Sequence, residues 1–386
     1  MITLAVGLAS LVVWIDLIFA RGQFWRVAER LDPVNPHEPR AFWPSVAAVM
    51  PARNEAALIG ETAPACLGQD YPGPLTLVVV DDQSSDPTAS LARRVSHADR
   101  QALVVEGVSP PHGWTGKLWA MQQGVDRADQ AARPDYLLFV DADIRLQPDV
   151  LRRLVALAET RGTVLVSLMA KLRCASAAER WLVPAFIFFF RMLYPFAWVN
   201  DPSRWTAAAA GGCMLVDRQA LTEAGGLTAL RGALIDDCAL AAALKRHGPI
   251  WLGMSDEALS LRAYPRFADF GRMIMRSAFA QLRYSVLWLA LTIVAMAVVF
   301  VAPPLLALFA NGLAEVCGAI AWAMMAFAFA PTLGFYGESA ARAVGLPAIA
   351  GLYTLFTVGS AGQVWRGRGG EWKGRIQAPA LKGRRA

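Results

Sequence analysis

Cysteine is scarce in this sequence, and no cysteine pair has the spacing of a metal site. Five cysteines are distributed over 386 residues without a CxxC pair or another ligand pattern, so we expect reduced and mostly buried thiols. The sequence also has no internal repeat and no low-complexity tract. These absences leave no sign of a disulfide framework, a cysteine metal site or a repeat architecture.

Net charge is scarce outside the C-terminal end. The chain has 37 Lys and Arg against 31 Asp and Glu, an excess of six bases. The tail from residue 366 to 386 has seven bases against one acid, so the remainder is near neutral. These bases are Arg366, Arg368, Lys373, Arg375, Lys382, Arg384 and Arg385. A local basic tail fits an anionic membrane surface better than a nucleic-acid cleft, and we expect no nucleic-acid partner.

Apolar residues, in contrast, are abundant. They make up 55% of the chain, and the mean hydropathy of +0.37 is high for a soluble protein and indicates a membrane component. The length favours two structural units. Residues 2–20 are apolar apart from Asp16, and basic residues follow them rather than precede them, unlike in a cleaved signal peptide. We therefore expect residues 1–30 to be an uncleaved anchor whose downstream side is cytoplasmic.

Three further apolar stretches lie near the C-terminus. Residues 286–309 and 313–335 are long enough to span a membrane, and residues 346–364 are a weaker candidate. Three crossings would place the basic tail outside, against the positive-inside tendency. We therefore expect two full crossings and one re-entrant or interfacial segment within residues 286–365, followed by a cytoplasmic tail at 366–386.

The region between these segments alternates predicted strands with predicted helices, after a proline-containing linker at 33–44. Helices are expected over 56–67, 89–95, 148–159 and 236–247, and another follows Lys117 and runs through Val125. This alternation predicts an α/β fold with a parallel sheet and right-handed crossovers. Strands are expected at 45–50, 75–80, 103–105, 136–140, 164–170 and 211–216.

Two segments of this region suggest contact with a membrane. Residues 182–198 are densely apolar but contain two prolines and Arg191, which favours a helix against the membrane or along an acceptor groove over a true span. Residues 272–284 are basic and amphipathic, and they suit a membrane interface.

Polar residues follow three of the predicted strands. The stretch Pro51 to Glu55 follows the first, Asp81 and Asp82 follow the second, and Asp141 and Asp143 follow the fourth. The carboxyl ends of parallel strands share one edge of a sheet, where ligands bind. Two carboxylates one residue apart at that edge can hold a hard divalent cation that also contacts substrate phosphates.

Each acidic cluster also has a structural interpretation. Asp81 and Asp82 can form a turn, the pair Asp236 and Asp237 can cap a helix, and Lys117 can be a surface residue. Together they supply a carboxylate pair for a nucleoside, a second for a metal, a lysine for phosphate and a third pair for a base. That set matches transfer of a sugar from a nucleotide-sugar.

The order and spacing of these motifs resemble family 2 glycosyltransferases, which are inverting enzymes. The resemblance covers about residues 45–285. The matching stretches are PARNE (51–55), DDQSSD (81–86), GK (116–117), DAD (141–143), GG (211–212) and DD (236–237). Within that family the stretches GWTGKLWA, LIDDCALA, AFAQLRYS and EWKGR are most similar to bacterial hopene-associated glycosyltransferases, and more distantly to ceramide glucosyltransferases.

The resemblance implies a fold, a reaction and partners. The fold would be a GT-A catalytic domain over residues 45–285, with a nucleotide-binding half (45–145) and an acceptor half (146–285). The donor would be a UDP-sugar, the cofactor Mg²⁺ or Mn²⁺, and the acceptor the hydroxyl of a hopanoid-like or other membrane lipid. The reaction would take place at the cytoplasmic face of the inner membrane.

The resemblance also implies residue roles. Asp141 and Asp143 would hold the metal, Lys117 the diphosphate, and Asp237 would be the general base, with Asp236 in a positioning role. Arg53, Glu55 and Asp82 would contact the uridine. The full predicted donor-binding set is Pro51, Ala52, Arg53, Glu55, Asp81, Asp82, Lys117, Asp141, Gly211, Gly212, Gln281 and Arg283.

Two departures from the family pattern are visible. Processive and ceramide-type members have a QxxRW motif, whereas Gln281 to Tyr284 is one residue shorter and ends in tyrosine, so its role is open. Asp236 stands where the family often has Glu. None of the four histidines falls in a matched motif, and we interpret them as incidental.

Three alternatives stay open. A polyprenyl phosphate acceptor is already ionised and would need no base. A nucleotidyltransferase would usually have a glycine-rich loop after the first strand, and PARNEA has no glycine. A non-catalytic membrane scaffold on a transferase fold is disfavoured because every acidic position is present. Donor sugar, acceptor and oligomeric state do not follow from the sequence.

Overall fold

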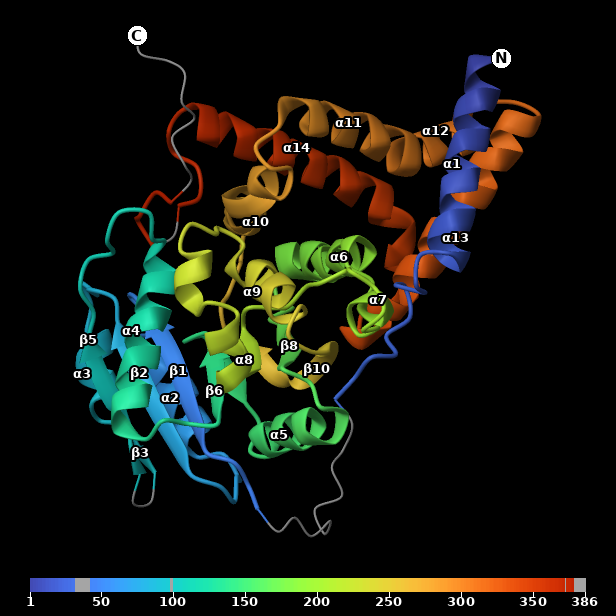
Figure 1. Cartoon of the computed structure of the whole chain (residues 1–386). Coiled ribbons are helices and arrows are strands. Elements are labelled where there is room, and N and C mark those ends of the chain that lie inside the picture. Colours follow the sequence, from blue (N-terminus) through green and yellow to red (C-terminus); the bar gives the residue numbers. More distant parts are fainter. Residues whose placement is uncertain (32–41, 98–99, 372, 378–386) are drawn as a thin grey trace. The chain divides into compact units, whose positions relative to one another are not determined.

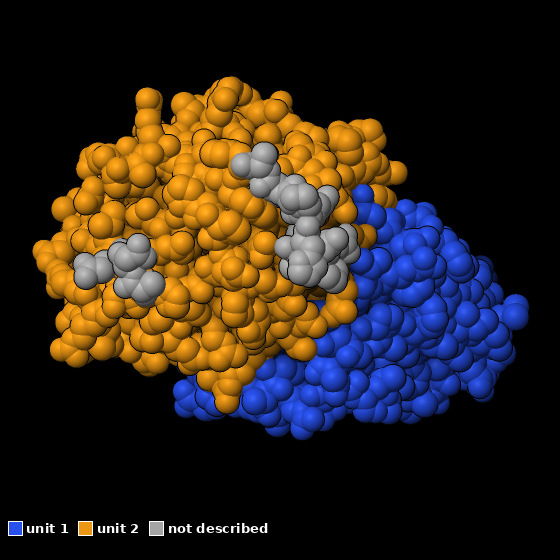
Figure 2. Space-filling model, turned by 90° about the horizontal axis from the view of Figure 1, so that it is seen from below, with its two compact units in different colours: residues 1–28, 174–197, 264–386 blue, residues 29–173, 198–263 orange. Residues whose placement is uncertain are grey.

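The computed structural model describes residues 1–31, 42–97, 100–371 and 373–377, and the chain divides into two compact units (Figure 2). The helical unit comprises residues 1–28, 174–197 and 264–386, and the sheet unit comprises residues 29–173 and 198–263. Most of the predicted linker and three of the tail bases (Lys382, Arg384 and Arg385) lie outside the described residues. The predicted domain limits stay predictions.

The sheet unit is built on an eight-stranded mixed sheet with the order β5-β2-β1-β6-β9-β8-β10-β7 (Figure 1). Its strands are β1 (Val46–Ala52), β2 (Leu75–Asp81), β5 (Leu103–Glu106), β6 (Tyr136–Val140), β7 (Ile144–Leu146), β8 (Leu165–Leu172), β9 (Cys213–Asp217) and β10 (Ile250–Ser260). A separate two-stranded sheet joins β3 (Ser96–His97) and β4 (Arg100–Gln101). The helices are α2 (Ile59–Leu67), α3 (Thr88–Ala92), α4 (Gly116–Ala131), α5 (Val150–Arg161), α8 (Arg218–Glu223) and α9 (Asp236–Leu244).

The first half of the sheet is parallel, as the strand and helix alternation predicts. Strands β5, β2, β1 and β6 pair in parallel, and every residue of β1 and β6 is buried. Strand β9 then runs antiparallel to both β6 and β8. Strands buried on both faces explain why these segments are continuous apolar runs rather than alternating ones.

The first strand does not end at residue 50, as predicted, but extends two residues further. Strand β1 continues through Pro51, which pairs with Val80, to Ala52, which pairs with Asp81. Its pairing to β6 ends earlier, at Val49. Beyond that point β1 has a neighbour on one side, and a position without a second neighbour can accommodate a proline.

Two strands of the second half are not predicted from the sequence. Strand β10 pairs in parallel with β8 and antiparallel with β7, and its register to β8 shifts between Met254 and Leu259. Asp256 and Glu257 fall within this bulge and interrupt the apolar pattern of the strand. This irregularity explains why the sequence did not predict β10, which is an 11-residue strand.

Among its described residues, the helical unit contains four helical segments that are long and apolar enough to cross a membrane. By length and composition these are 2–19, 286–309, 313–335 and 340–365, so the third C-terminal segment meets the same criterion as the other two. The number of true crossings stays a prediction. The helices are α1 (Ile2–Phe19), α6 (Ala177–Leu193), α10 (Phe267–Gln281), α11 (Val286–Met296), α12 (Ala302–Phe309), α13 (Leu313–Phe335) and α14 (Leu346–Trp365). A π-helical turn, η2 (Ala297–Val301), joins α11 to α12, and a 3-10 turn, η3 (Ala340–Gly345), precedes α14. The short helix α7 (Phe196–Val199) contains residues of both units.

Most of residues 182–198, predicted to form a membrane-surface or groove-lining helix, lie in α6. Leu182, Val183, Ala185, Ile187 and Phe188 are fully buried. The ring of Phe188 lies 5.3 Å from those of both Phe24 and Phe329, within the same unit. One side of α6 is therefore part of the protein core, whereas Trp181 and Leu193 are exposed. The roles predicted for 182–198 and 272–284 stay predictions.

Candidate active site

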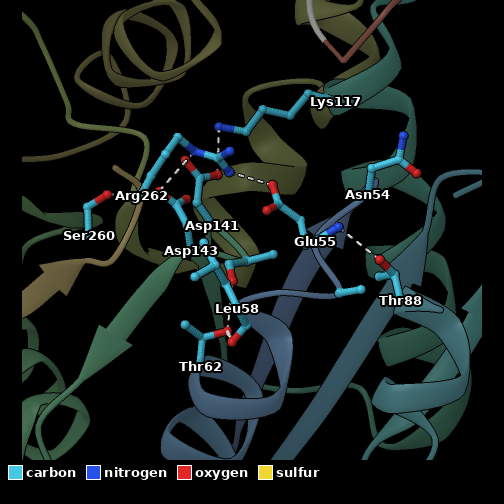
Figure 3. Close-up of polar contacts among 12 residues, drawn as sticks. Asn54, Glu55, Leu58, Thr62, Thr88, Lys117, Asp141, Asp143, Ser260 and Arg262 are labelled. Carbon is cyan, nitrogen blue, oxygen red and sulfur yellow. Dashed lines mark hydrogen bonds and ion pairs between the residues drawn. The ribbon is translucent and has the colours of Figure 1, made fainter. Parts of the chain in front are cut away.

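The sheet topology brings five chain segments to one edge. Strands β1, β2 and β6 are parallel, so the loops that follow them leave the sheet at the same edge. Strand β9 runs the opposite way and therefore starts there, directly after Gly211 and Gly212. Strand β10 is parallel to β8, which is antiparallel to β9, so β10 also ends at this edge, with Arg262 two residues beyond it. Figure 3 shows some of the side chains that meet there, among them Glu55, Asp141, Asp143 and Arg262.

Backbone contacts tie the loops after β1 and β2 together. The guanidinium of Arg53 donates to the carbonyl oxygens of Asp82 and Gln83. The Asn54 side chain accepts from the backbone N–H of Ser85 at 2.8 Å. Asn54 and Gln83 both adopt left-handed backbone angles, with φ of 51° and 56°. The two loops therefore form one rigid wall, of the kind that a bound nucleoside requires.

The residues predicted to contact the nucleoside differ in how accessible they are to a ligand. Ala52 and Asp82 are fully buried, and the backbone N–H of Asp82 donates to the carbonyl of Ala52 at 2.8 Å. Pro51 is buried within β1 as well, so Pro51 and Ala52 act as scaffold. Asp81 is different. Its Oδ2 accepts from the Ser84 N–H at 3.3 Å, whereas its buried Oδ1 has no hydrogen-bond partner among the described residues, which leaves an acceptor for a ligand N–H or O–H.

The DAD motif occupies the tight turn between β6 and β7. The hydroxyl of Thr62 donates to the carbonyl of Ala142 at 2.7 Å and fixes the turn. Asp141 Oδ1 lies 2.9 Å from the Lys117 ammonium. Asp143 Oδ2 accepts from the Ser260 hydroxyl at 2.8 Å and lies 3.3 Å from Nε of Arg262. Each carboxylate of the motif thus has a cationic partner.

Helix α4 places Lys117 at this edge. It packs on β1 and β2, and a Cβ on its Gly124 would lie 2.3 Å from Val49 Cγ1, so glycine permits the close approach. Burial alone would lower the pKa of Lys117, but the charges of Asp141, Asp236 and Asp237 outweigh it and raise the pKa above its usual value. Lys117 is therefore a permanent cation in the site.

The pair Asp236 and Asp237 begins α9. Asp237 Oδ2 accepts from the Gly211 N–H at 2.9 Å and Oδ1 from the Cys238 N–H at 2.7 Å. Asp236 Oδ2 lies 3.6 Å from Lys117 Nζ. Burial and the charge of Asp236 raise the pKa of Asp237 to about 6, although Lys117 and the two backbone N–H groups act in the opposite direction.

The two glycines at the start of β9 link the acidic pairs. A Cβ on Gly211 would lie 3.2 Å from Asp237 Oδ2 and 3.3 Å from Lys117 Nζ, so a side chain there would crowd both groups. The carbonyl of Gly212 accepts from the Asp141 N–H at 3.1 Å. Burial is also the largest cause that raises the pKa of Asp141, and the charges of Asp143 and Asp236 add to it while Lys117 opposes them.

Sequence reasoning missed Ser260 and Arg262. Arg262 pairs with Glu55 as well as Asp143, so it joins the loop after β1 to the turn after β6. The available signal was the same as for the other segments, polar residues at the end of a strand, but β10 was not recognised. The other predicted residues lie together in the sheet unit, except Gln281 and Arg283.

Gln281 and Arg283 belong to the helical unit. The Gln281 amide donates to the hydroxyl of Tyr194, and Arg283 is exposed with a left-handed φ of 54°. Their assignment to the donor site stays a prediction.

The donor set of the DAD motif fits a divalent cation that arrives with a phosphate ligand. Among residues 1–31, 42–97, 100–371 and 373–377, no group of three or more His, Cys, Asp or Glu side chains can hold a metal by itself. Asp141 and Asp143 nevertheless supply the oxygen ligands that Mg²⁺ and Mn²⁺ prefer. Mg²⁺ is commonly held by one or two carboxylates, with substrate phosphates completing its coordination.

Part of the chain matches a known protein family. Residues 47–225 match the family model "Glycosyl transferase family 2". A solved structure, the mannosyltransferase PcManGT from Pyrobaculum calidifontis in complex with GDP-Man and Mn²⁺, has the same fold. It is 21% identical with a TM-score of 0.53, over 94% of this chain and 98% of that chain. These findings support a family 2 glycosyltransferase and confirm the predicted GT-A fold with apolar terminal helices.

Particular relatives are similar over shorter stretches. An N-acetylglucosaminyltransferase from Rhizobium leguminosarum bv. viciae is 29% identical over 140 residues, which are 36% of this chain and 31% of that protein. A 4,4'-diaponeurosporenoate glycosyltransferase from Staphylococcus aureus is 33% identical over 120 residues, 31% of this chain and 29% of that protein. The chain thus spans about a third of the length of these relatives, and the hopene-associated subfamily stays a prediction.

Proposed function

We propose that this protein is a membrane-bound inverting glycosyltransferase that transfers a sugar from a UDP-sugar to the hydroxyl of a membrane lipid. The observation that carries the proposal is the meeting of Lys117, the DAD motif and the half-buried Asp237 at one sheet edge. The apolar helices of the helical unit support a lipid acceptor. So does the similarity to the diaponeurosporenoate glycosyltransferase, whose name gives a lipid-like carboxylate as acceptor. A hopanoid-like lipid is the acceptor that the motif resemblance favours.

The donor site would be organised by charge. Asp141 and Asp143 would hold Mg²⁺ or Mn²⁺ against the diphosphate, as the Mn²⁺ of the PcManGT complex suggests. The cation would stabilise the charge that develops on the departing nucleoside diphosphate. Lys117, which is 2.9 Å from Asp141 and permanently charged, would bind the same diphosphate. The rigid wall formed by the loops after β1 and β2 would hold the uridine.

Asp237 would be the general base. The acceptor oxygen would bond to the anomeric carbon while the bond from that carbon to the diphosphate oxygen breaks, and its electron pair would leave with UDP. The hydroxyl proton would pass to Asp237. A pKa of about 6 keeps this carboxylate ionised at neutral pH while it remains a stronger base than an ordinary aspartate. Attack from the face opposite the leaving group inverts the configuration without a covalent intermediate.

The backbone amides around Asp237 would fix its orientation. The N–H groups of Gly211 and Cys238 each hold one of its oxygens. A carboxylate oxygen has two lone-pair directions, so each oxygen retains one for an incoming hydroxyl. Asp236 would assist from a distance, because its charge helps to raise the pKa of Asp237.

The proposal also assigns an orientation to the membrane. The sheet unit would lie in the cytoplasm at the inner membrane, where UDP-sugars are made, and the basic tail would face the same side. A reporter fused after Ala386 should be active in the cytoplasm. Activity of that reporter outside the cytoplasm would contradict this orientation.

The proposal is tested by lipid mass spectrometry. The full chain in detergent is incubated with a panel of UDP-sugars, Mn²⁺ and a membrane lipid extract that contains hopanoids. We expect one lipid class to gain a sugar mass, with stoichiometric release of UDP and a product that resists mild acid. A product that mild acid cleaves to a lipid phosphate would identify a polyprenyl phosphate acceptor instead. Absence of any glycosylated lipid would contradict the proposal.

A further inference from the structure

Both carboxylates of the DAD motif are paired with basic side chains from elsewhere in the chain. Lys117 comes from α4 and lies 2.9 Å from Asp141. Arg262 comes from the loop after β10, and its Nε lies 3.3 Å from Asp143. Figure 3 shows the two cations approaching the motif from different sides. Lys117 has a predicted role as a phosphate-binding residue, whereas Arg262 has none.

Arg262 also holds a second anion. Its Nη2 pairs with the carboxylate of Glu55, whose side chain is 9% exposed, so one guanidinium joins two strand ends that are far apart in sequence. The side chain of Arg262 itself remains 29% exposed, so the cation is open to solvent and to a ligand. A guanidinium presents its N–H groups in a planar fork that binds carboxylates and phosphates equally well.

We propose that Arg262 is a second diphosphate-binding residue, which neutralises Asp143 until the donor arrives and thereby couples metal binding to nucleotide binding. This inference rests on the proposed function. In the absence of a donor, Arg262 and a divalent cation compete for the same carboxylate. When a diphosphate enters, Arg262 keeps Glu55, releases Asp143 and contacts a phosphate oxygen. Asp143 is then available to the metal.

Electrostatic repulsion explains why the metal and the nucleotide would increase, rather than decrease, each other's affinity. A divalent cation at Asp143 would lie a few ångströms from the guanidinium, and two positive charges at that distance repel unless an anion lies between them. The diphosphate supplies that anion. The metal and the nucleotide should therefore each increase the affinity of the other by the same factor, because coupling between two binding sites is reciprocal.

The test measures the binding of Mn²⁺ and of UDP to the full chain in detergent, by calorimetry and by the electron paramagnetic resonance of free Mn²⁺. In the intact protein we expect Mn²⁺ alone to bind weakly and saturating UDP to tighten it at least about tenfold. Arg262→Gln should tighten Mn²⁺ alone by about three- to tenfold, because a competing cation is gone. The same change should weaken UDP by about 10- to 100-fold, because a charged hydrogen bond is lost.

Two further variants separate binding from a structural role. Arg262→Lys keeps the charge without the fork, so we expect it to retain weak binding of Mn²⁺ alone and to lose part of the UDP affinity. Arg218→Gln is the matched control, because Arg218 pairs with Asp129 and its side chain is similarly exposed at 27%. Arg218 follows β9 and so lies at the opposite edge of the sheet. We expect the control to change neither affinity.

The outcomes distinguish this inference from the proposed function. If the intact protein binds no UDP, the proposed function is wrong and this inference falls with it. If the intact protein binds UDP and folded Arg262→Gln has unchanged affinities, only the inference is wrong. A parallel loss of both affinities in Arg262→Gln also overturns it, since a purely structural arginine would give that result. If Arg262→Gln does not fold, Arg262→Lys decides, because UDP affinity equal to that of the intact protein would contradict the inference.

Discussion

The two units of this protein place their polar and apolar residues in opposite ways. In the sheet unit strands β1 and β6 are buried on both faces, and charged side chains gather at one edge, where Lys117 and Arg262 each pair with a carboxylate. In the helical unit, large apolar side chains lie on the outside. They include Leu8, Val12, Ile15 and Phe19 on α1, Leu287, Leu291 and Val294 on α11, and Leu308 and Phe309 on α12.

The difference indicates that the two units are built for different surroundings. Exposed apolar surface of this extent is costly in water and neutral in lipid. A cluster of carboxylates and cations has the opposite preference, since charges are stable where water or paired ions surround them. The comparison assigns chemistry to the sheet unit and membrane attachment to the helical unit. Changes made in one unit should therefore leave the property of the other intact.

The largest expected effect concerns the proposed metal ligands of the sheet unit. Asp143→Ala should reduce transfer by at least about a thousandfold, because the proposed cation would supply several kcal/mol of transition-state stabilisation. An excess of EDTA should have the same effect on the intact protein. The amount of protein recovered in membranes should not change. Full turnover in excess chelator would remove the metal assignment.

A pair of valine substitutions tests whether α1 of the helical unit inserts into a membrane. Val12 on α1 is 62% exposed and Val108 in the sheet unit is 57% exposed, so a substitution at either site meets little steric resistance. Val12→Arg should oppose insertion of α1 by about 2.5–3.5 kcal/mol, roughly a hundredfold, because arginine is costly at the centre of a membrane helix. Val108→Arg should have no effect on insertion.

Insertion of α1 can be followed with a cysteine placed at Ile2 and a membrane-impermeant maleimide added from outside the cell. Labelling should fall strongly in Val12→Arg and remain at the parent level in Val108→Arg. Equal labelling of both variants would mean that α1 does not lie in a membrane, and the contrast between the two units would fail.

The smallest expected effect is the pH dependence of the transfer rate, which arises in the sheet unit. Asp237 must be ionised to accept a proton, and its pKa is raised to about 6. The transfer rate at saturating donor should therefore fall as pH decreases through this value, to about a tenth at pH 5. Since the pKa is raised in the folded state, this group favours folding at low pH and loses that contribution as pH rises through about 6. A rate that is constant from pH 7.5 to pH 5 would contradict the assignment.

Much of the candidate site follows from the sequence because three strands are regular. The apolar runs of β1, β2 and β6 each lead directly into polar residues, and the parallel topology then requires that these meet. Asp237 and Gly211 also come together as their motifs predict. These features depend on local pattern and on a simple rule of topology, which one sequence can supply.

The missed features depend on contacts between distant residues. Arg262 and Glu55 are separated by 207 positions in the sequence. The strand that brings Arg262 to the site is difficult to recognise in the sequence, because a bulge around Asp256 interrupts its pattern. The packing of α6 does not follow from the sequence for another reason. An apolar helix with the same composition can face lipid or fill a protein core, and only its neighbours distinguish the two.

The central claim is that Asp237 removes the proton of a hydroxyl acceptor, and one substitution tests it most directly. Asp237→Asn keeps the size of the side chain but removes its basicity. It also exchanges one of the two backbone hydrogen bonds for an unfavourable N–H contact, so a melting curve must first show that the variant is folded. Asp236→Asn is the control, since the role proposed for that residue is positioning and its loss should cost less.

The measurement combines UDP-sugar affinity with the rate of sugar transfer to the lipid. We predict that Asp237→Asn retains its donor affinity while transfer falls by about 10²- to 10⁴-fold, the usual contribution of a general base. Transfer at the rate of the intact protein would show that Asp237 is not the base and that the acceptor is already an anion.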